Sequence, residues 1–241
     1  RETLEWQSEM QDPDEFMATL KKELFEDEVY IFTPKGAIKV LPKGSTPIDF
    51  AYQIHEQIGH HMVGCKINSK MMPIITKLKN GDIISIDIGA CSKGYHGDSA
   101  WTYAVGEVDD KTRKLLEDTE KSLFVGLAQV KPGNRIGDIG YAIEQYAHKH
   151  NLGVVKELCG HGVGTSVHED PEVPNYGIPN TGPRLKEGMV IAVEPMLTLG
   201  RPDIFIHDNN WTIDTQDGSL SAHFEHTVVV TKDGYQILTG E

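Results

Sequence analysis

Apolar residues recur at helical spacing near the start of the chain. Within residues 1–27, Phe16, Leu20 and Leu24 would share one face of a helix. Asp12, followed by Pro13, stands where a helix cap is expected. The pattern predicts an acidic, amphipathic helix that leads into the rest of the protein.

The pattern from residue 28 to residue 82 predicts a small unit of strands and one helix. Residues 29–32 and 37–41 are β-branched or apolar and are separated by turn residues, which indicates a hairpin. Thr46 and Pro47 are typical of a helix start, and Gly59 of a helix end. The expected buried stripe of this helix is Ile48, Ala51, Ile54, His55 and Ile58.

Alternating apolar residues over 61–67 then predict a strand. The order of hairpin, helix, strand, turn and strand is typical of a β-grasp unit. From residue 83 the pattern changes to two strands at 83–91 and 95–105, followed by two helices near 110–130 and 136–150. Further strands are expected at 154–159, 189–196, 204–207, 211–214, 223–231 and 235–238. This is an α+β layout with a mostly antiparallel sheet.

Composition narrows the class of protein. The 241 residues are 39% hydrophobic, which is enough to fill a packed core, and no apolar run reaches the roughly 18 residues of a membrane span. Three distant cysteines favour neither a disulfide framework nor a thiolate metal knuckle, and they suit a reducing compartment. The N-terminus lacks the pattern of a secretion signal. We therefore expect a cytoplasmic protein without a membrane partner.

The net charge of −13 is unevenly distributed. Residues 1–28 and 83–241 are acidic, whereas residues 29–82 carry seven lysines against three acids. His55 and His60 in this basic segment are candidates for contact with RNA. A solvated surface explains four excess charges equally well, so both interpretations stay open.

Two acids occupy positions where an apolar residue is expected. Asp87 interrupts the strand Ile-Ile-Ser-Ile-Asp-Ile, and Glu194 interrupts Met-Val-Ile-Ala-Val-Glu. A lone carboxylate in such surroundings costs several kcal/mol unless it is protonated, paired or bound to a metal. A salt-bridged or edge-exposed acid is the alternative for either position.

The expected hairpin brings a second acid to Asp87. If Ser92 and Lys93 form the centre of the turn, Asp87 lies directly opposite Asp98. Directly opposed residues bring their Cβ atoms to about 4.5–5.5 Å, where like charges repel. No lysine or arginine is aimed at the pair by the pattern, whereas two divalent cations about 3.5–4 Å apart need bridging carboxylates at this separation.

Three further residues are candidates for the same site. His161 lies among glycines that leave its imidazole accessible, and Glu225 lies on a strand whose other face is apolar. With Glu194 they would complete an oxygen-rich donor set with one nitrogen. Such a set suits Mn²⁺ or Fe²⁺ and tolerates Co²⁺ or Zn²⁺, and four acids balance the charge of two divalent ions.

From residue 79 to the C-terminus the sequence resembles the type I methionine aminopeptidases of the pita-bread fold. The shared motifs are IDIG, GYHGDSAWTYAVG, CGHGVGTSVHEDPEVPNYG, VIAVEPM and SLSAHFEHTVVVT. The resemblance implies a dimetal site held by Asp87, Asp98, His161, Glu194 and Glu225, in which Asp98 and Glu225 bridge the ions. Asp87 would bind one ion, and His161 and Glu194 the other.

The same resemblance implies roles beyond the ligands. Glu194 would also shuttle a proton, His168 would bond to the peptide near the scissile link, and Trp211 would wall the methionine pocket. The alternative for His168 is an exposed loop histidine. His96 and His226 neighbour ligands but match no ligand position, so we expect them to be structural.

Residues 28–86 resemble the TGS domain of the RelA/SpoT stringent-response proteins. The shared stretch runs from VYIFTPKG through LPKGSTPIDFAYQIHEQIGHHMVGCKIN to LKNGD, preceded by the acidic lead-in helix of residues 1–27. This resemblance implies a β-grasp module at 28–82 that engages RNA, the ribosome or another regulatory partner, with His55 or His60 near a tRNA end. A packed histidine is the alternative at both positions.

Together the two resemblances predict a TGS-like domain joined to an incomplete pita-bread domain at 83–241. The expected function is dimetal-dependent removal of N-terminal methionine from peptides and nascent proteins, impaired by the missing first third of the fold. The alternative is a non-catalytic RNA-binding or regulatory protein with an inactive peptidase remnant. Faces that the missing third would cover predict self-association.

Overall fold

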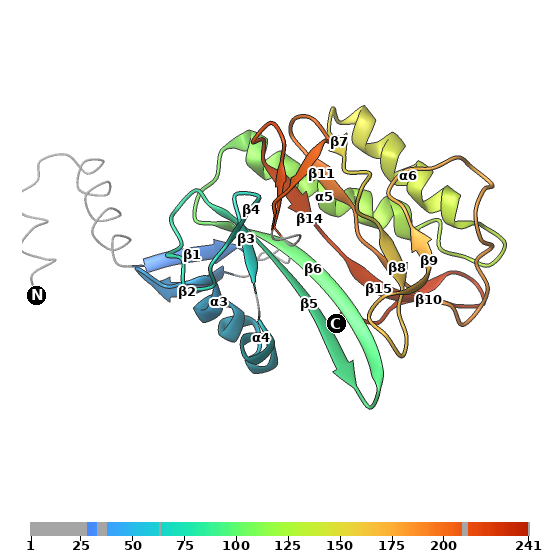
Figure 1. Ribbon diagram of the computed structural model, residues 1–241, viewed down its shortest axis with the longest axis horizontal. Helices are drawn as coiled ribbons and strands as arrows, with labels where there is room; N and C mark the ends of the chain where they lie inside the picture. Colours follow the sequence, from blue (N-terminus) through green and yellow to red (C-terminus); the bar gives the residue numbers. More distant parts are fainter. Residues whose placement is uncertain (1–27, 33–37, 63, 209–211, 241) are drawn as a thin grey trace, which may run out of the picture.

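The computed structural model describes residues 28–32, 38–62, 64–208 and 212–240 (Figure 1). The expected lead-in helix of residues 1–27 and Trp211 lie outside the described residues, as does the side chain of His60. The elements in chain order are β1 (Glu28–Phe32), β2 (Ile38–Pro42), α3 (Pro47–Ile54), α4 (Glu56–His61), β3 (Cys65–Ile67), β4 (Lys70–Met72), β5 (Ile83–Ser92), β6 (Tyr95–Val105), α5 (Asp110–Leu127), α6 (Ile136–Lys149), β7 (Gly153–Val154), β8 (Gly160–Gly162), β9 (Glu169–Val173), β10 (Val190–Val193), β11 (Met196–Thr198), β12 (Ile204–Ile206), β13 (Ile213–Thr215), β14 (Ser221–His223), β15 (His226–Val230) and β16 (Tyr235–Ile237).

One sheet joins the N-terminal unit to the long β5–β6 hairpin. Its strand order is β2-β1-β6-β5-β3-β4, and its neighbouring strands pair antiparallel. The first part of β5 pairs with β3 through Lys66 opposite Ser85 and Ile67 opposite Ile84. Beyond that point β5 continues along β6 alone, as the long green hairpin of Figure 1 shows. A single strand therefore serves both the N-terminal unit and the segment that contains Asp87.

The predicted helix over residues 47–59 is two helices. Thr46 donates from its backbone N–H to the Asp49 carboxylate over 2.8 Å and caps α3 as expected. His55, with φ −163°, is extended and ends α3, so Gly59 falls inside α4 and is not the stop. The expected stripe also missed the main anchor, Phe50, whose fully buried ring meets Tyr103 edge-on at 5.0 Å between ring centroids.

The predicted register of the β5–β6 hairpin was wrong by two residues. Asp87 lies opposite Ala100, and Asp98 lies opposite Gly89. Lys93 and Gly94 form the turn, because both adopt positive φ (52° and 83°), as the tight two-residue hairpin turn requires. A shift of two residues keeps each side chain on its face, so the two aspartates share a face as diagonal neighbours.

Two long strands expected in the C-terminal half are each interrupted at an acid. Residues 189–196 form β10 and β11, which flank Glu194, and residues 223–231 form β14 and β15, which flank Glu225. β10 pairs with β15 in a five-stranded sheet, and β11 pairs with β14 in a three-stranded sheet. The two interruptions face each other, so both glutamates lie where paired strands pass from one sheet to the other. Strands β8 and β9 were not predicted.

Two clusters of buried apolar side chains form the core of the protein. One is formed by α5, α6 and the C-terminal strands, and includes Leu115, Ile143 and Phe224. The other is formed by the N-terminal unit and includes Ile31 and Phe50. The partly buried Trp101 side chain of β6 packs against both clusters. No helix among the described residues is long and apolar enough to cross a membrane.

Candidate metal centre

The structure brings the five expected metal ligands together. Potential donor atoms lie within 4.8 Å of one another in three overlapping groups. These groups are Asp87, Asp98 and Glu225; His161, Glu194 and Glu225; and Asp98, His161 and His168. The five expected ligands come from β5, β6, β8 and the two strand interruptions, and His168 comes from the segment between β8 and β9. Segments up to 138 residues apart in the sequence, from 87 to 225, therefore form one cluster.

Hydrogen bonds between β6 and the C-terminal strands position Asp98 and Glu225. The backbone N–H of Glu225 donates to the carbonyl of Ala100 over 2.8 Å. Thr227 accepts from the Asp98 N–H and donates to the Asp98 carbonyl, both over 2.8 Å. Asp98 and Glu225 are 7% and 1% exposed, so their carboxylates lie in the interior.

His161 presents a lone pair to two acids. Its Nδ1 lies 2.9 Å from the carbonyl of Gly162, and because a carbonyl can only accept, Nδ1 carries the proton. Nε2, the ring nitrogen left to bind a cation, lies 3.6 Å from Oε1 of Glu194 and 3.7 Å from Oδ2 of Asp98. Two ligands bound to one ion at about 2.1 Å in tetrahedral geometry are about 3.4 Å apart. The three atoms are therefore spaced as ligands of a shared cation.

Burial and mutual repulsion make this cluster unfavourable without a cation. Oε1 of Glu225 is buried and has no hydrogen-bond partner among the described residues. Burial, followed by the charges of Glu194, Asp87 and Asp98, raises the pKa of Glu225 well above its usual value. Asp87 is exposed as a residue, yet protein surrounds its carboxyl closely enough that desolvation raises its pKa to about 6.

The other predicted site residues occupy varied positions. His168 is exposed, and its ring lies edge-on to His161 with 4.2 Å between centroids. His96 and His226 approach other groups, at 3.4 Å from the Gly164 carbonyl and 3.1 Å from the Thr239 hydroxyl. His55 is exposed between α3 and α4.

Three contributors were missed by sequence reasoning. His223 places Nε2 3.1 Å from Oε2 of Glu194, and the Asn175 amide donates to the Glu194 carbonyl over 2.9 Å. Lys66 is a cation that does face the acids, contrary to expectation, and the charges of Asp87, Asp214 and Glu194 act on it. Its signal was available: in a strand with buried Cys65 and Ile67, the residue between them must point to the opposite face.

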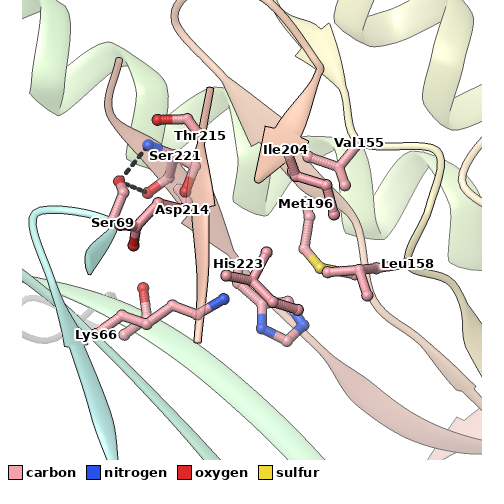
Figure 2. A pocket seen from close by; sticks show the side chains of 13 residues that line it. Lys66, Ser69, Val155, Leu158, Met196, Ile204, Asp214, Thr215, Ser221 and His223 are labelled. Carbon is pink, nitrogen blue, oxygen red and sulfur yellow. Dashed lines mark hydrogen bonds between the residues drawn. The ribbon is translucent and has the colours of Figure 1, made fainter. Parts of the chain in front are cut away.

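A pocket lies beside the acid cluster (Figure 2). His223 lines this pocket and is hydrogen-bonded to Glu194 of the cluster. Val155, Leu158, Met196 and Ile204 form an apolar wall, while Lys66 and Asp214 stand on the other side. The open space between them is about 30 Å³, room for one or two water molecules. The full lining is Lys66, Ser69, Ser85, Val155, Leu158, Met196, Ile204, Ile213, Asp214, Thr215, Ser221, Ala222 and His223.

Comparison with known proteins identifies the family to which this arrangement belongs. Residues 22–232 match metallopeptidase family M24. The chain belongs to this family. It is 50% identical over 186 residues to methionine aminopeptidase 1 of Bacillus subtilis, a match that covers 77% of this chain and 71% of that protein. It is also 48% identical over 162 residues to the methionine aminopeptidase of Clostridium acetobutylicum, covering 67% of this chain and 65% of that protein.

Solved structures extend the similarity of this M24 chain. The methionine aminopeptidase of Rickettsia prowazekii superposes with a TM-score of 0.76 at 39% identity, covering 82% of this chain and 87% of the other. The Thermotoga maritima enzyme gives a TM-score of 0.75 at 35% identity, covering 83% and 87%. By sequence, the match to a Rickettsia prowazekii methionine aminopeptidase covers 67% of this chain. For Rickettsia prowazekii, the structural match therefore covers more of the chain than the sequence match does.

Membership of a metallopeptidase family implies divalent metal ions, and the donor atoms fit them. The unpartnered Oε1 of Glu225 and the lone pair on Nε2 of His161 are what a cation would bind. Thiolates take no part, because the free cysteines Cys65, Cys91 and Cys159 belong to none of the three donor groups. The chain is accordingly a metallopeptidase of the methionine aminopeptidase group.

Proposed function

We propose that the protein removes N-terminal methionine from peptides and nascent proteins by means of two divalent metal ions. The single observation that supports this most strongly is the approach of His161 Nε2 to both Glu194 and Asp98, at the separation of atoms that bind one cation. It occurs in a chain 50% identical to a methionine aminopeptidase.

We assign the five ligands as follows. Asp98 and Glu225 would be shared by the two ions, since each belongs to two of the three donor groups and, unlike His161, offers two carboxylate oxygens. Asp87 completes one ion site, and His161 and Glu194 complete the other. When bound, such ions supply Lewis acidity for a peptide carbonyl and for water.

The remaining steps fall to side chains of this chain. Exposed His168, whose ring lies edge-on to His161, would donate a hydrogen bond to the substrate peptide. Glu194 receives and returns the proton that moves during hydrolysis, and His223 holds its Oε2 throughout. Trp211, outside the described residues, is proposed as a wall of the methionine pocket.

The donor chemistry favours particular metals. Carboxylate oxygens with one imidazole nitrogen suit Mn²⁺ or Fe²⁺, and Co²⁺ and Zn²⁺ are also accepted. We propose that Mn²⁺, Fe²⁺, Co²⁺ or Zn²⁺ occupies both sites.

Release of methionine from Met-Ala-Ser tests the proposal. Dialysed protein receives Mn²⁺ or Co²⁺, and the Asp98→Ala variant at the same metal concentration is the control. We expect methionine release by the parent and at least a 100-fold loss in the variant. Equal release by both proteins, or none by a parent that retains metal, would contradict the proposal.

The N-terminal unit carries a second, independent proposal. A TGS-like module at 28–82 with exposed His55 would contact RNA or the ribosome through its excess of lysines. Retention of the His55→Ala variant on ribosomes to the same extent as the parent would contradict it. Self-association and a cytoplasmic location also stay predictions, and sedimentation across a tenfold range of concentration tests the first.

A further inference from the structure

Lys66 lies on the face of the sheet that contains the acid cluster. It is the middle residue of β3, and its neighbours Cys65 and Ile67 point into the N-terminal core. Its cross-strand partner is Ser85, two residues before Asp87 on β5, so the three side chains share one face. Figure 2 shows the side chain of Lys66 extended across the pocket toward the ring of His223.

The surroundings of this ammonium are acidic on one side and apolar on the other. His223, which lines the pocket, is hydrogen-bonded to Glu194. This hydrogen bond links the pocket directly to the cluster. Attraction to Asp87, Asp214 and Glu194 opposes the desolvation that lowers the pKa of Lys66. Lys66 therefore lies at the margin of the cluster, where the charges of two of its carboxylates, Asp87 and Glu194, act on the amine.

We propose that Lys66 is a counter-cation of the acid cluster, one that stabilises the metal-free protein and weakens the binding of divalent cations. Its positive charge offsets part of the repulsion among the carboxylates while no metal is bound. A divalent ion that enters the cluster meets this like charge in surroundings that desolvate the amine, where Coulomb interactions are strong. The inference rests on the proposed metal site and adds a residue that tunes its affinity.

The test compares metal affinity and stability in matched variants. Lys66→Met removes the charge and keeps most of the length of the side chain, and Lys66→Arg keeps the charge. Lys70→Met is the control, since exposed Lys70 pairs with Ile67 and so lies on the other face of the same hairpin. Mn²⁺ affinity is measured by calorimetric titration, and thermal unfolding is recorded in EDTA.

We expect Lys66→Met to bind Mn²⁺ at least tenfold more tightly than the parent and to unfold at a lower temperature in EDTA. Lys66→Arg and Lys70→Met should bind within threefold of the parent. Unchanged or weaker Mn²⁺ binding by Lys66→Met would overturn the inference even where the parent binds the metal. If none of these proteins binds Mn²⁺, the proposed function fails. The inference is overturned separately if Lys66→Met and Lys70→Met unfold at the same temperature in EDTA.

Discussion

Nε2 of His223 lies 3.1 Å from Oε2 of Glu194, and this contact separates the tasks of the two carboxylate oxygens. Oε2 accepts a hydrogen bond from the ring, while Oε1 lies 3.6 Å from Nε2 of His161. Loss of such an orienting partner typically reduces metal affinity or activity 10–100-fold. His223 is thus expected to act on the metal through Glu194.

The His223→Ala variant should bind Mn²⁺ about 10–100-fold more weakly than the parent. His223→Gln keeps a donor at a similar reach and is expected to recover most of this loss. Calorimetric titration of the two variants and the parent measures the effect. Equal affinities for His223→Ala and the parent would show that the ring does not orient Glu194.

The Glu225→Gln variant should be more stable than the parent without metal and less stable with it. Burial and three nearby acids raise the pKa of Glu225, so its ionised form costs stability in the metal-free protein. The amide removes that charge and also removes a ligand. Each kcal/mol shifts the unfolding temperature of a protein of this size by about 2–4 °C. A Glu225→Gln variant that Mn²⁺ stabilises as much as the parent would contradict the assignment of this ligand.

The metal-free protein should lose stability as the pH rises from about 4 through 6. Asp87 has a pKa of about 6 in the folded chain and about 3.9 when unfolded, so the folded state holds more protons across this window. A carboxyl with a raised pKa favours the folded state at low pH, and this contribution disappears above the folded pKa. Glu225 acts in the same direction. Calorimetry in EDTA from about pH 4 to 8 measures the trend.

Metal should reverse this pH dependence, because ligands bind in their deprotonated form. With saturating Mn²⁺ we expect stability to rise from pH 5 to 7. Asp87→Asn serves as the control and should flatten the fall seen in EDTA. A metal-free parent whose unfolding temperature rises from pH 5 to 7 as steeply as the Mn²⁺-loaded protein would refute the assignment of raised pKa values.

A buried charge away from the metal centre should matter for stability alone. Asp118 is 3% exposed and accepts hydrogen bonds from Lys114 at 2.6 Å and Tyr146 at 3.2 Å, with His150 3.0 Å away. Burial would raise the pKa of Asp118, but the bonds from Lys114 and His150 outweigh burial and hold it below its usual value. Ionised Asp118 therefore stabilises the folded state at neutral pH, and this stabilisation is lost as the pH falls below about 4.

Replacing Asp118 by Ala should destabilise the protein by about 3 kcal/mol, since it leaves buried partners without their acceptor. The matched control is Glu117→Gln, which breaks the solvent-exposed Glu117–Lys121 pair at 3.5 Å and should cost less than 1 kcal/mol. Urea unfolding in EDTA compares the two. A similar loss of unfolding free energy in both variants would show that burial does not determine how much the Asp118 network stabilises the protein.

Strong periodicity made the central elements predictable from the sequence. The helices α5 and α6 and the strands β5 and β6 lie where the 3.6-residue and two-residue patterns placed them. The register of the hairpin did not follow from that pattern, because apolar alternation is the same for a shift of two residues. Turn chemistry decided it: Gly94 readily takes the second positive φ, and Lys93 takes the first.

The candidate ligands could be recognised because acids in apolar strands are costly, and the structure brings all five together. The interruptions at Glu194 and Glu225 were not predicted. Pro195 was a signal for the first, because proline cannot donate to a strand ladder, whereas the residues around Glu225 resemble a continuous strand. Lys66 was missed because two of the three acids whose charges act on it, Glu194 and Asp214, lie far from β3 in the sequence. Local patterns give the face of a strand but not what packs against that face.

The most direct test of the metal centre is anomalous diffraction from crystals of the Mn²⁺-loaded protein. Two peaks are predicted: one within about 2.1–2.3 Å of His161 Nε2 and Glu194, the other at a similar distance from Asp87, with Asp98 and Glu225 between them. Manganese bound elsewhere, or no peak at the five side chains in a protein saturated with Mn²⁺, would contradict the account.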